Sequence, residues 1–276
     1  MKIGIIGTGN MGTIILEAFI ESLAVAPSNL IITNRTIQKA YTLQQAYPDI
    51  QVVASPKEVA QLADIIFVCT KPLDINPLLA SIAEELVPEK TIVSITSPIS
   101  VEQLESAVNC QVVRAIPSIT NRALAGVSLL TFGNRCKQQT KDYVNGLFSQ
   151  ISTTIEIEND ITRVSSDIVS CGPAFISFIL QDFIRAAVAE TKISTETATS
   201  LVSGMMIGFG KLLEKEVFTL STLQEKVCVK GGITGEGIKV LEQELGPVFN
   251  HLFQATHRKY REDLNEVSHQ FQPYED

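Results

Sequence analysis

The chain has 276 residues and a formal charge of −8, from 22 Lys and Arg residues against 30 Asp and Glu residues. This acidic balance disfavours nucleic acid and anionic membranes as partners, because phosphate binding requires clustered basic side chains. Hydrophobic residues make up 45% of the chain and charged residues 19%, which is typical of a globular protein and excludes a disordered one.

The cellular compartment can be predicted from the cysteines and the N-terminus. The five cysteines are widely spaced and form no C-x-x-C pair, so neither a metal site nor a disulfide framework is predicted. The N-terminus leads directly into an apolar strand and lacks the pattern of a secretory signal. Apolar runs such as residues 64–70 are shorter than the roughly 20 residues that span a bilayer. We therefore expect a cytoplasmic protein that binds neither a membrane nor nucleic acid.

The first half of the sequence alternates short β-rich runs with helical stretches. Continuous apolar runs such as residues 65–68 indicate strands buried on both faces, and the helical stretches between them indicate parallel crossover connections. The pattern predicts an α/β domain at residues 1–158, with a Rossmann-type doubly wound sheet. Its predicted strands cover residues 2–6, 30–33, 50–54, 65–70, 91–95, 111–115, 127–132 and 152–157.

From residue 159 onward the pattern changes to long helices, separated chiefly by turns that contain glycine. Apolar residues such as Phe175, Phe178 and Phe183 lie on more than one helix face, which exceeds what a small bundle buries. We therefore predict an all-helical domain at residues 159–276 that associates with a second copy of the chain, as a homodimer or higher oligomer. Residues 267–276 are polar and are expected to form a loose tail.

A glycine-rich motif follows the first predicted strand and precedes a predicted helix. In such a motif the first glycine permits the tight turn, the second lets the backbone approach a pyrophosphate, and the third allows helix and strand to pack closely. The motif predicts a dinucleotide site at Gly7, Thr8, Gly9, Asn10, Met11 and Gly12.

The end of the second strand indicates which dinucleotide is preferred. An NAD enzyme usually has Asp or Glu there, whereas this chain has Asn34, Arg35 and Thr36. A cation and hydrogen-bond donors suit a 2′-phosphate, so NADPH is the expected cofactor and NADH remains an alternative. Lys71 and Pro72 follow the fourth strand at the sheet edge where ligands bind, and they complete the predicted cofactor site.

Three further segments resemble the pyrroline-5-carboxylate reductase family. They are Arg114-Ala115-Ile116-Pro117, Cys171-Gly172-Pro173-Ala174-Phe175 and Gly231-Gly232-Ile233-Thr234. With the glycine-rich loop and Lys71-Pro72, the resemblance extends over nearly the whole chain. It implies an NADPH-binding domain, a helical domain that dimerises, and reduction of 1-pyrroline-5-carboxylate to L-proline.

The resemblance also implies a substrate site. In the family, a Ser-Pro-Gly-Gly-Thr-Thr-like loop before a helix holds the substrate carboxylate, and its counterpart here is Val229, Lys230, Gly231, Gly232, Ile233 and Thr234. The segment keeps backbone donors at a helix N-terminus. The resemblance assigns a catalytic role to one residue, Thr234, whose hydroxyl meets the ring nitrogen of the substrate. Val229 replaces the serine of the family and Lys230 its proline. Such departures resemble a divergent branch that some bacteria encode in late-competence operons.

Three functions are consistent with these residues. The leading hypothesis is an NADPH-dependent reductase of a small cyclic imine, because the cofactor loop and the Gly232–Thr234 segment are both retained. The alternatives are a reductase of another small acid and a non-catalytic regulatory protein that binds NADPH. Cys171, expected at the start of a helix, is interpreted either as a redox-sensitive thiol or as a small packed residue.

Overall fold

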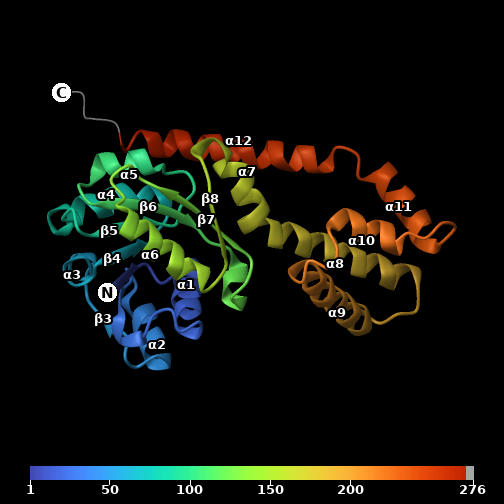
Figure 1. The fold of residues 1–276 in the computed structure, drawn as a ribbon, viewed down its shortest axis with the longest axis horizontal. Helices are drawn as coiled ribbons and strands as arrows, with labels where there is room; N and C mark the ends of the chain where they lie inside the picture. The colour runs from blue at the N-terminus through green and yellow to red at the C-terminus, as the bar shows by residue number, and fades with distance from the viewer. Residues whose placement is uncertain (272–276) are drawn as a thin grey trace. The chain divides into compact units, whose positions relative to one another are not determined.

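The computed structural model describes residues 1–271, which contain an eight-stranded sheet in the order β3-β2-β1-β4-β5-β6-β7-β8 (Figure 1). Each predicted strand is present. The bounds are β1 (Ile3–Ile6), β2 (Leu30–Thr33), β3 (Gln51–Val52), β4 (Ile65–Val68), β5 (Thr91–Ser94), β6 (Gln111–Ile116), β7 (Val127–Phe132) and β8 (Thr153–Glu156).

Strand β7 runs antiparallel to β6, whereas every other pair in the sheet is parallel. The connection between β6 and β7 covers residues 117–126 and contains only the short 3₁₀ helix η3 (Ile119–Ala123). A parallel return needs a crossover of a dozen or more residues, so this short connection brings the chain back in the opposite direction. The sheet is therefore doubly wound, with one antiparallel pairing, β6 with β7, near its edge.

Helices cover both faces of the sheet, as the continuous apolar strands predict. One core cluster packs α1 (Asn10–Glu21), α2 (Ile37–Ala46) and α6 (Gln138–Ser149) against one face, where the rings of Phe19 and Phe148 meet edge to face at 5.7 Å. A second cluster packs α3 (Pro56–Leu62), α4 (Pro72–Ile82) and α5 (Val101–Ala107) against the other face. Alternate residues of one strand serve the two clusters, since Ile5 belongs to the first and Ile6 to the second.

The order of the strands positions a ligand site. Strand β1 lies between β2 and β4, and the chain winds outward from it in both directions. Ligands of open α/β sheets bind outside the carboxyl ends of the strands at this switch point. The glycine-rich motif begins there, immediately after β1.

The chain forms two compact units, one made of residues 1–173 with 255–276 and the other of residues 174–254. The last helix, α12 (Val248–Ser268), therefore returns the chain to the first unit. The expected boundary after residue 158 stays a prediction about the family's domains, while the first compact unit continues through Pro173.

The expectation of a loose C-terminal tail is wrong for residues 267–271. Val267 is 1% exposed and belongs to the second core cluster, against which Phe271 also packs. Earlier on α12, the Tyr260 hydroxyl donates to the Ser97 carbonyl at 3.0 Å. Residues 272–276 lie outside the described part of the chain.

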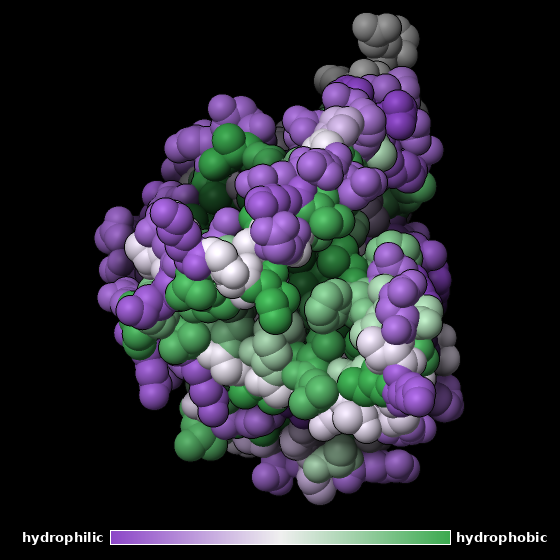
Figure 2. Space-filling view, turned by 90° about the vertical axis from the view of Figure 1, so that its right-hand side faces the viewer, coloured by the Kyte–Doolittle hydropathy of each residue, from purple (hydrophilic) through white to green (hydrophobic). Residues whose placement is uncertain are grey.

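The second unit is helical, as expected, with α8 (Gly172–Glu190), α9 (Thr195–Glu214), α10 (Leu220–Val227) and α11 (Ile233–Glu244). Many of its apolar side chains are exposed in the single chain, including Phe178 at 66% and Phe183 at 61%. Figure 2 shows apolar side chains gathered on one exposed face in a space-filling view.

A continuous helical stretch, Asn159–Glu190, includes α7 (Thr162–Ser166), a π-helical turn at Asp167–Cys171 and then α8. Within the described residues it is the one helix that is long and apolar enough to cross a membrane by length and composition, since an 18-residue window of it has a mean hydropathy of 1.4. That criterion alone is weak evidence, because helices of soluble proteins also meet it.

Candidate functional site

A cavity of about 770 Å³ lies at the carboxyl ends of β1, β2 and β4, within the first unit. It is at the switch point of the sheet and has the size expected for a small-molecule or cofactor site. Its walls are formed by Ile6, Gly7, Gly9, Thr33, Asn34, Arg35, Thr36, Ile37, Lys39, Ala54, Pro56, Cys69, Thr70, Lys71, Asp74 and Leu78.

The three glycines of the motif have three different surroundings. Gly7 has a φ of +101°, and a Cβ there would lie 2.6 Å from the Cys69 carbonyl oxygen. A Cβ on Gly12 would lie 2.0 Å from the Gly7 carbonyl oxygen, so α1 can pack this closely on the loop only without a side chain. A Cβ on Gly9, by contrast, would have no described atom within 4 Å. The loop is therefore packed tightly on the protein side and open on the cavity side.

The start of α1 offers hydrogen-bond donors to this open side. Gly9 is its N-cap residue, and no side chain of the described chain caps the helix. The first N–H groups of a helix lack backbone partners, and the helix dipole adds positive potential there. The Thr8 and Thr70 hydroxyls are buried and have no hydrogen-bond partner among residues 1–271. Thr70 lines the cavity, and the uncapped start of α1 fits the pyrophosphate of a dinucleotide.

Asn34 shapes the loop from the neighbouring strand. Its Oδ1 accepts a hydrogen bond from the Thr8 backbone N–H at 3.0 Å, and its Nδ2 donates to the Thr36 carbonyl at 3.0 Å. Both ends of the amide are thus engaged within the protein. In this structure Asn34 ties the glycine-rich loop to the end of β2, and its donation to a phosphate, through the second N–H of the amide, stays a prediction.

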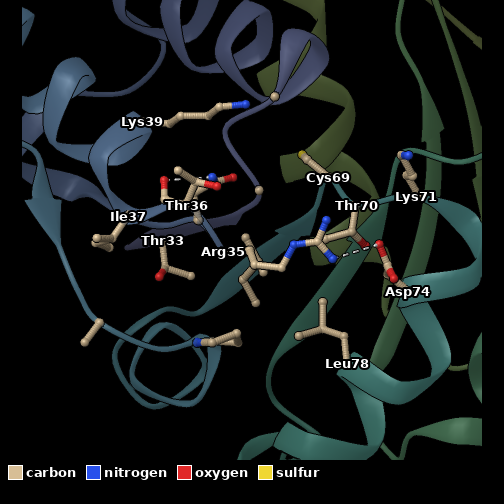
Figure 3. Close-up of a pocket in the computed structure, with 16 residues that line it drawn as sticks. Thr33, Arg35, Thr36, Ile37, Lys39, Cys69, Thr70, Lys71, Asp74 and Leu78 are labelled. Atoms are coloured by element: carbon tan, nitrogen blue, oxygen red, sulfur yellow. Dashed lines mark hydrogen bonds and ion pairs between the residues drawn. The ribbon is translucent and has the colours of Figure 1, made fainter.

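Three basic side chains line the cavity. Arg35 follows β2, Lys71 follows β4 and N-caps α4, and Lys39 lies in the first turn of α2. In Figure 3, Arg35 extends toward Asp74, while Lys39 lies on a different side of the pocket. Pro72 begins α4 and lines a neighbouring cavity with Lys71. Sequence reasoning missed Lys39, whose position four residues after Arg35 was the available signal.

Cys69 contributes a neutral wall to the cavity. Desolvation by burial raises the pKa of its thiol from an ordinary value of about 9 to about 12. The thiol therefore stays protonated at neutral pH and adds no negative charge beside the expected phosphates.

The predicted substrate loop, residues 229–234, belongs to the second unit, and none of its residues lines this cavity. Gly231 has a φ of +76°, which favours glycine, and Gly232 is the N-cap of α11, with no side-chain cap in the described chain. The Gly232 N–H donates to the Val229 carbonyl at 2.9 Å and closes the turn. Val229 and Ile233 are 65% and 93% exposed, and Thr234 is exposed in the first turn of α11.

Comparison with known proteins gives the family. Residues 158–263 match the family model described as "Pyrroline-5-carboxylate reductase dimerisation", and residues 2–98 match "NADP oxidoreductase coenzyme F420-dependent". The chain is 30% identical over 261 residues to Pyrroline-5-carboxylate reductase 3 of Bacillus subtilis, covering 94% of this chain and 95% of that one. The chain belongs to the pyrroline-5-carboxylate reductase family.

Other members are similar over the same length. ComE operon protein 4 of Bacillus subtilis is 56% identical over 271 residues, covering 98% of this chain and 99% of that one. The NADP-bound structure of Plasmodium falciparum pyrroline carboxylate reductase has a TM-score of 0.81 at 22% identity, covering 97% of this chain and 98% of that one. A pyrroline-5-carboxylate reductase from Coxiella burnetii gives 0.82 at 20% identity, with 96% and 98% covered. This chain has their fold, which is that of NAD(P)-dependent oxidoreductases, and its dimerisation domain implies self-association.

Arg114, of the Arg114-Ala115-Ile116-Pro117 segment, has a structural role in this member of the family. Arg114 is 2% exposed, and its Nη2 donates to Asn159 Oδ1 at 2.9 Å and to Thr162 Oγ1 at 2.7 Å. It also donates to Thr131 Oγ1 at 3.1 Å. Burial lowers the pKa of this guanidinium, opposed by Tyr260 and Glu102. Arg114 thus fastens the start of the long helix to β6 and β7.

Cys171 does not lie at the start of a helix in this family member, contrary to expectation. It ends the π-helical turn within the continuous stretch Asn159–Glu190, so no helix N-terminus is present to stabilise a thiolate. Burial raises the pKa of its thiol, although Arg163, whose Nη2 lies 3.5 Å from the sulfur, acts in the opposite direction. These surroundings favour a packed, protonated residue.

Proposed function

We propose that this protein binds NADPH in the cavity beside Gly9 and reduces the C=N bond of a small cyclic imine, with 1-pyrroline-5-carboxylate as the first substrate to test. The observation that carries the proposal is the open side of the glycine-rich loop. There, the uncapped N-terminus of α1 adjoins a cavity that Thr70, Arg35, Lys39 and Lys71 also line.

Each group of residues has a role in this reaction. When bound, the dinucleotide supplies a hydride to the electrophilic imine carbon. The glycine-rich loop and the N-terminus of α1 hold its pyrophosphate, and the cations hold a 2′-phosphate. NADH, which lacks that phosphate, is the alternative cofactor.

The turn before α11 supplies the substrate contacts. The N–H groups of Ile233 and Thr234 hold the substrate carboxylate, and the Thr234 hydroxyl meets the ring nitrogen, while Gly231 and the Gly232 N–H give the turn its shape. Val229 offers no hydroxyl where the family has serine. One lost hydrogen bond to a charged group weakens binding or rate about ten- to a hundredfold.

The test is NADPH oxidation by the purified full-length protein with 1-pyrroline-5-carboxylate. We expect slow turnover by the natural chain and faster turnover, by about tenfold or more, in Val229→Ser and in Val229→Ser combined with Lys230→Pro. Val217→Ser, which changes a comparably exposed valine outside the loop, is the matched control and should leave the rate unchanged. No turnover by any of these proteins would refute the imine reductase proposal.

A second function is favoured by the same exposed Val229 and by the 56% identity to ComE operon protein 4, whose name states no reductase activity. In this alternative the protein binds NADPH without turnover and signals its level through the dimer. Binding without turnover in every variant would select it. Turnover with a different small acid would select the third hypothesis. A cytoplasmic location suits each of these, because the described cysteines are free thiols.

A further inference from the structure

The Arg35 side chain lies between two neighbouring cavities of the first unit. The first is the proposed cofactor cavity. The second has a volume of about 450 Å³ and shares Arg35, Lys71 and Asp74 with it. The far wall of the second cavity is acidic, because Asp263 and Glu266 of α12 line it. Arg35 therefore lines both the proposed cofactor cavity and the acidic cavity, and Asp74 does so too.

Asp74 is the fixed member of the pair that it forms with Arg35. It lies in the first turn of α4, where its backbone N–H donates to the Lys71 carbonyl at 3.0 Å and the helix dipole favours its charge. The same turn is held by the end of the chain, since Gln270 Nε2 donates to the Leu73 carbonyl at 3.1 Å. The backbone that carries Asp74 is thus held by contacts that do not involve Arg35.

Arg35 is the more exposed member. Its side chain is 87% exposed, and its Nη1 lies 3.9 Å from Asp74 Oδ2, as the dashed line in Figure 3 marks. Exposed ion pairs at such distances contribute little to stability, so a stronger anion can take the guanidinium from Asp74. A phosphate bound by Arg35 would also meet repulsion from this carboxylate, whereas a ribose hydroxyl could donate a hydrogen bond to it.

The other carboxylates of this wall are engaged or lie farther from Arg35. Asp263 Oδ1 accepts from Lys259 Nζ at 2.7 Å. Among the described residues, Asp74 is the carboxylate that forms an ion pair with Arg35. Its carboxylate is therefore the group whose removal changes Arg35 most directly.

We infer that Asp74 is a positioning residue for cofactor choice: it holds Arg35 away from the 2′-phosphate position in the free protein and thereby reduces the preference for NADPH over NADH. This inference rests on the proposed dinucleotide site. NADPH must break the Arg35–Asp74 ion pair to bring its 2′-phosphate to Arg35, whereas NADH leaves this ion pair intact.

The experiment measures dissociation constants of NADPH and NADH by calorimetry, with no turnover required. Adenosine 2′,5′-bisphosphate and adenosine 5′-monophosphate serve as probes of the phosphate end alone. In Asp74→Asn we expect NADPH and the bisphosphate to bind about two- to fivefold more tightly, with no gain for NADH or the monophosphate. The gain should shrink as salt is added. Asp74→Glu should restore the natural ratio.

The controls separate a held arginine from simple charge repulsion. Asp49→Asn removes an exposed carboxylate of the same unit outside both cavities and should change neither constant. In an Arg35→Gln background, Asp74→Asn should improve NADPH binding clearly less than in the natural background, because only the direct repulsion of the phosphate is then relieved. A full gain in that background, or equal changes for NADPH and NADH, would overturn the inference while leaving the dinucleotide site intact. Failure of the natural chain to bind either dinucleotide would instead overturn the proposed function and this inference with it.

Discussion

A Cβ atom on Gly12 would lie 2.0 Å from the carbonyl oxygen of Gly7, so the closest approach of α1 to the glycine-rich loop is a backbone-to-backbone contact. We expect Gly12→Ala to push the helix from the loop and lower the free energy of unfolding by about 3 kcal/mol. Urea denaturation measures this. Gly146→Ala lies in the exposed part of α6, where the added Cβ would contact no neighbouring element within 4 Å, and it should be neutral or stabilising by up to about 1 kcal/mol. Equal effects of the two changes would contradict the packing argument.

Gly9→Ala should leave stability nearly unchanged and weaken cofactor binding. Its added methyl meets open space in the free protein, so the free energy of unfolding should change by less than about 1 kcal/mol. The same methyl would occupy the side from which the pyrophosphate approaches, and we expect NADPH affinity to fall at least about tenfold. Calorimetric titration of the natural chain, Gly9→Ala and Gly146→Ala gives the comparison. Undiminished affinity in Gly9→Ala would place the pyrophosphate elsewhere.

Because the buried Cys69 thiol resists ionisation, it should make the free energy of unfolding fall at alkaline pH. Burial raises the pKa of its thiol to about 12 in the folded chain, so above its ordinary value of about 9 the unfolded chain releases a proton that the folded chain keeps. The stability contribution is therefore fully present below about pH 9 and is lost as pH rises toward 12, by about 1 kcal/mol at pH 10. Denaturation at pH 7 and pH 10 should show a smaller loss for Cys69→Ala.

The matched control for this titration is Val68→Ala, which truncates the neighbouring buried side chain and removes no titratable group. It should lower stability at both pH values and keep the pH dependence of the natural chain. If Cys69→Ala kept that dependence too, the alkaline loss would come from another group.

Val267 tests the return of the C-terminus to the first unit. Because this side chain is 1% exposed in the second core cluster, Val267→Ala should reduce the free energy of unfolding by about 2 kcal/mol. Val217→Ala, at a side chain that is 53% exposed, should change it by less than about 0.5 kcal/mol. A negligible effect at both positions would mean that the last turn of α12 detaches in solution.

The sequence predicts those parts of the fold and site that depend on local patterns. Continuous apolar runs identify the strands, because burial on both faces leaves no polar alternation, and the spacing Gly7, Gly9, Gly12 predicts three different packing environments. Lys39 and Asp74 were not predicted as parts of the site, because they reach the cavity through the packing of α2 and α4 on the sheet. Val267 was missed because a single valine among polar residues gives no periodic signal.

Pro173 explains the error at Cys171. A proline near the start of an apolar stretch usually occupies the first turn of a helix, so the sequence indicates a new helix there. In the structure the preceding π-helical turn, Asp167–Cys171, continues into α8 and accommodates the proline within one helical stretch. Such a local widening of the helix has no residue pattern that could be recognised in advance.

The discontinuity of the first unit has a consequence for how the protein is made. Its sheet and cavity are encoded before residue 174, but Val267 and Phe271 complete one of its two cores. During synthesis the nascent chain can form the sheet while residues 174–254 are still being translated, yet that core stays open until Val267 and Phe271 have been added and have left the ribosome. Closure of this core therefore waits for translation of the whole helical unit, and a gene fragment that ends after the sheet would encode a unit with a permanently open core.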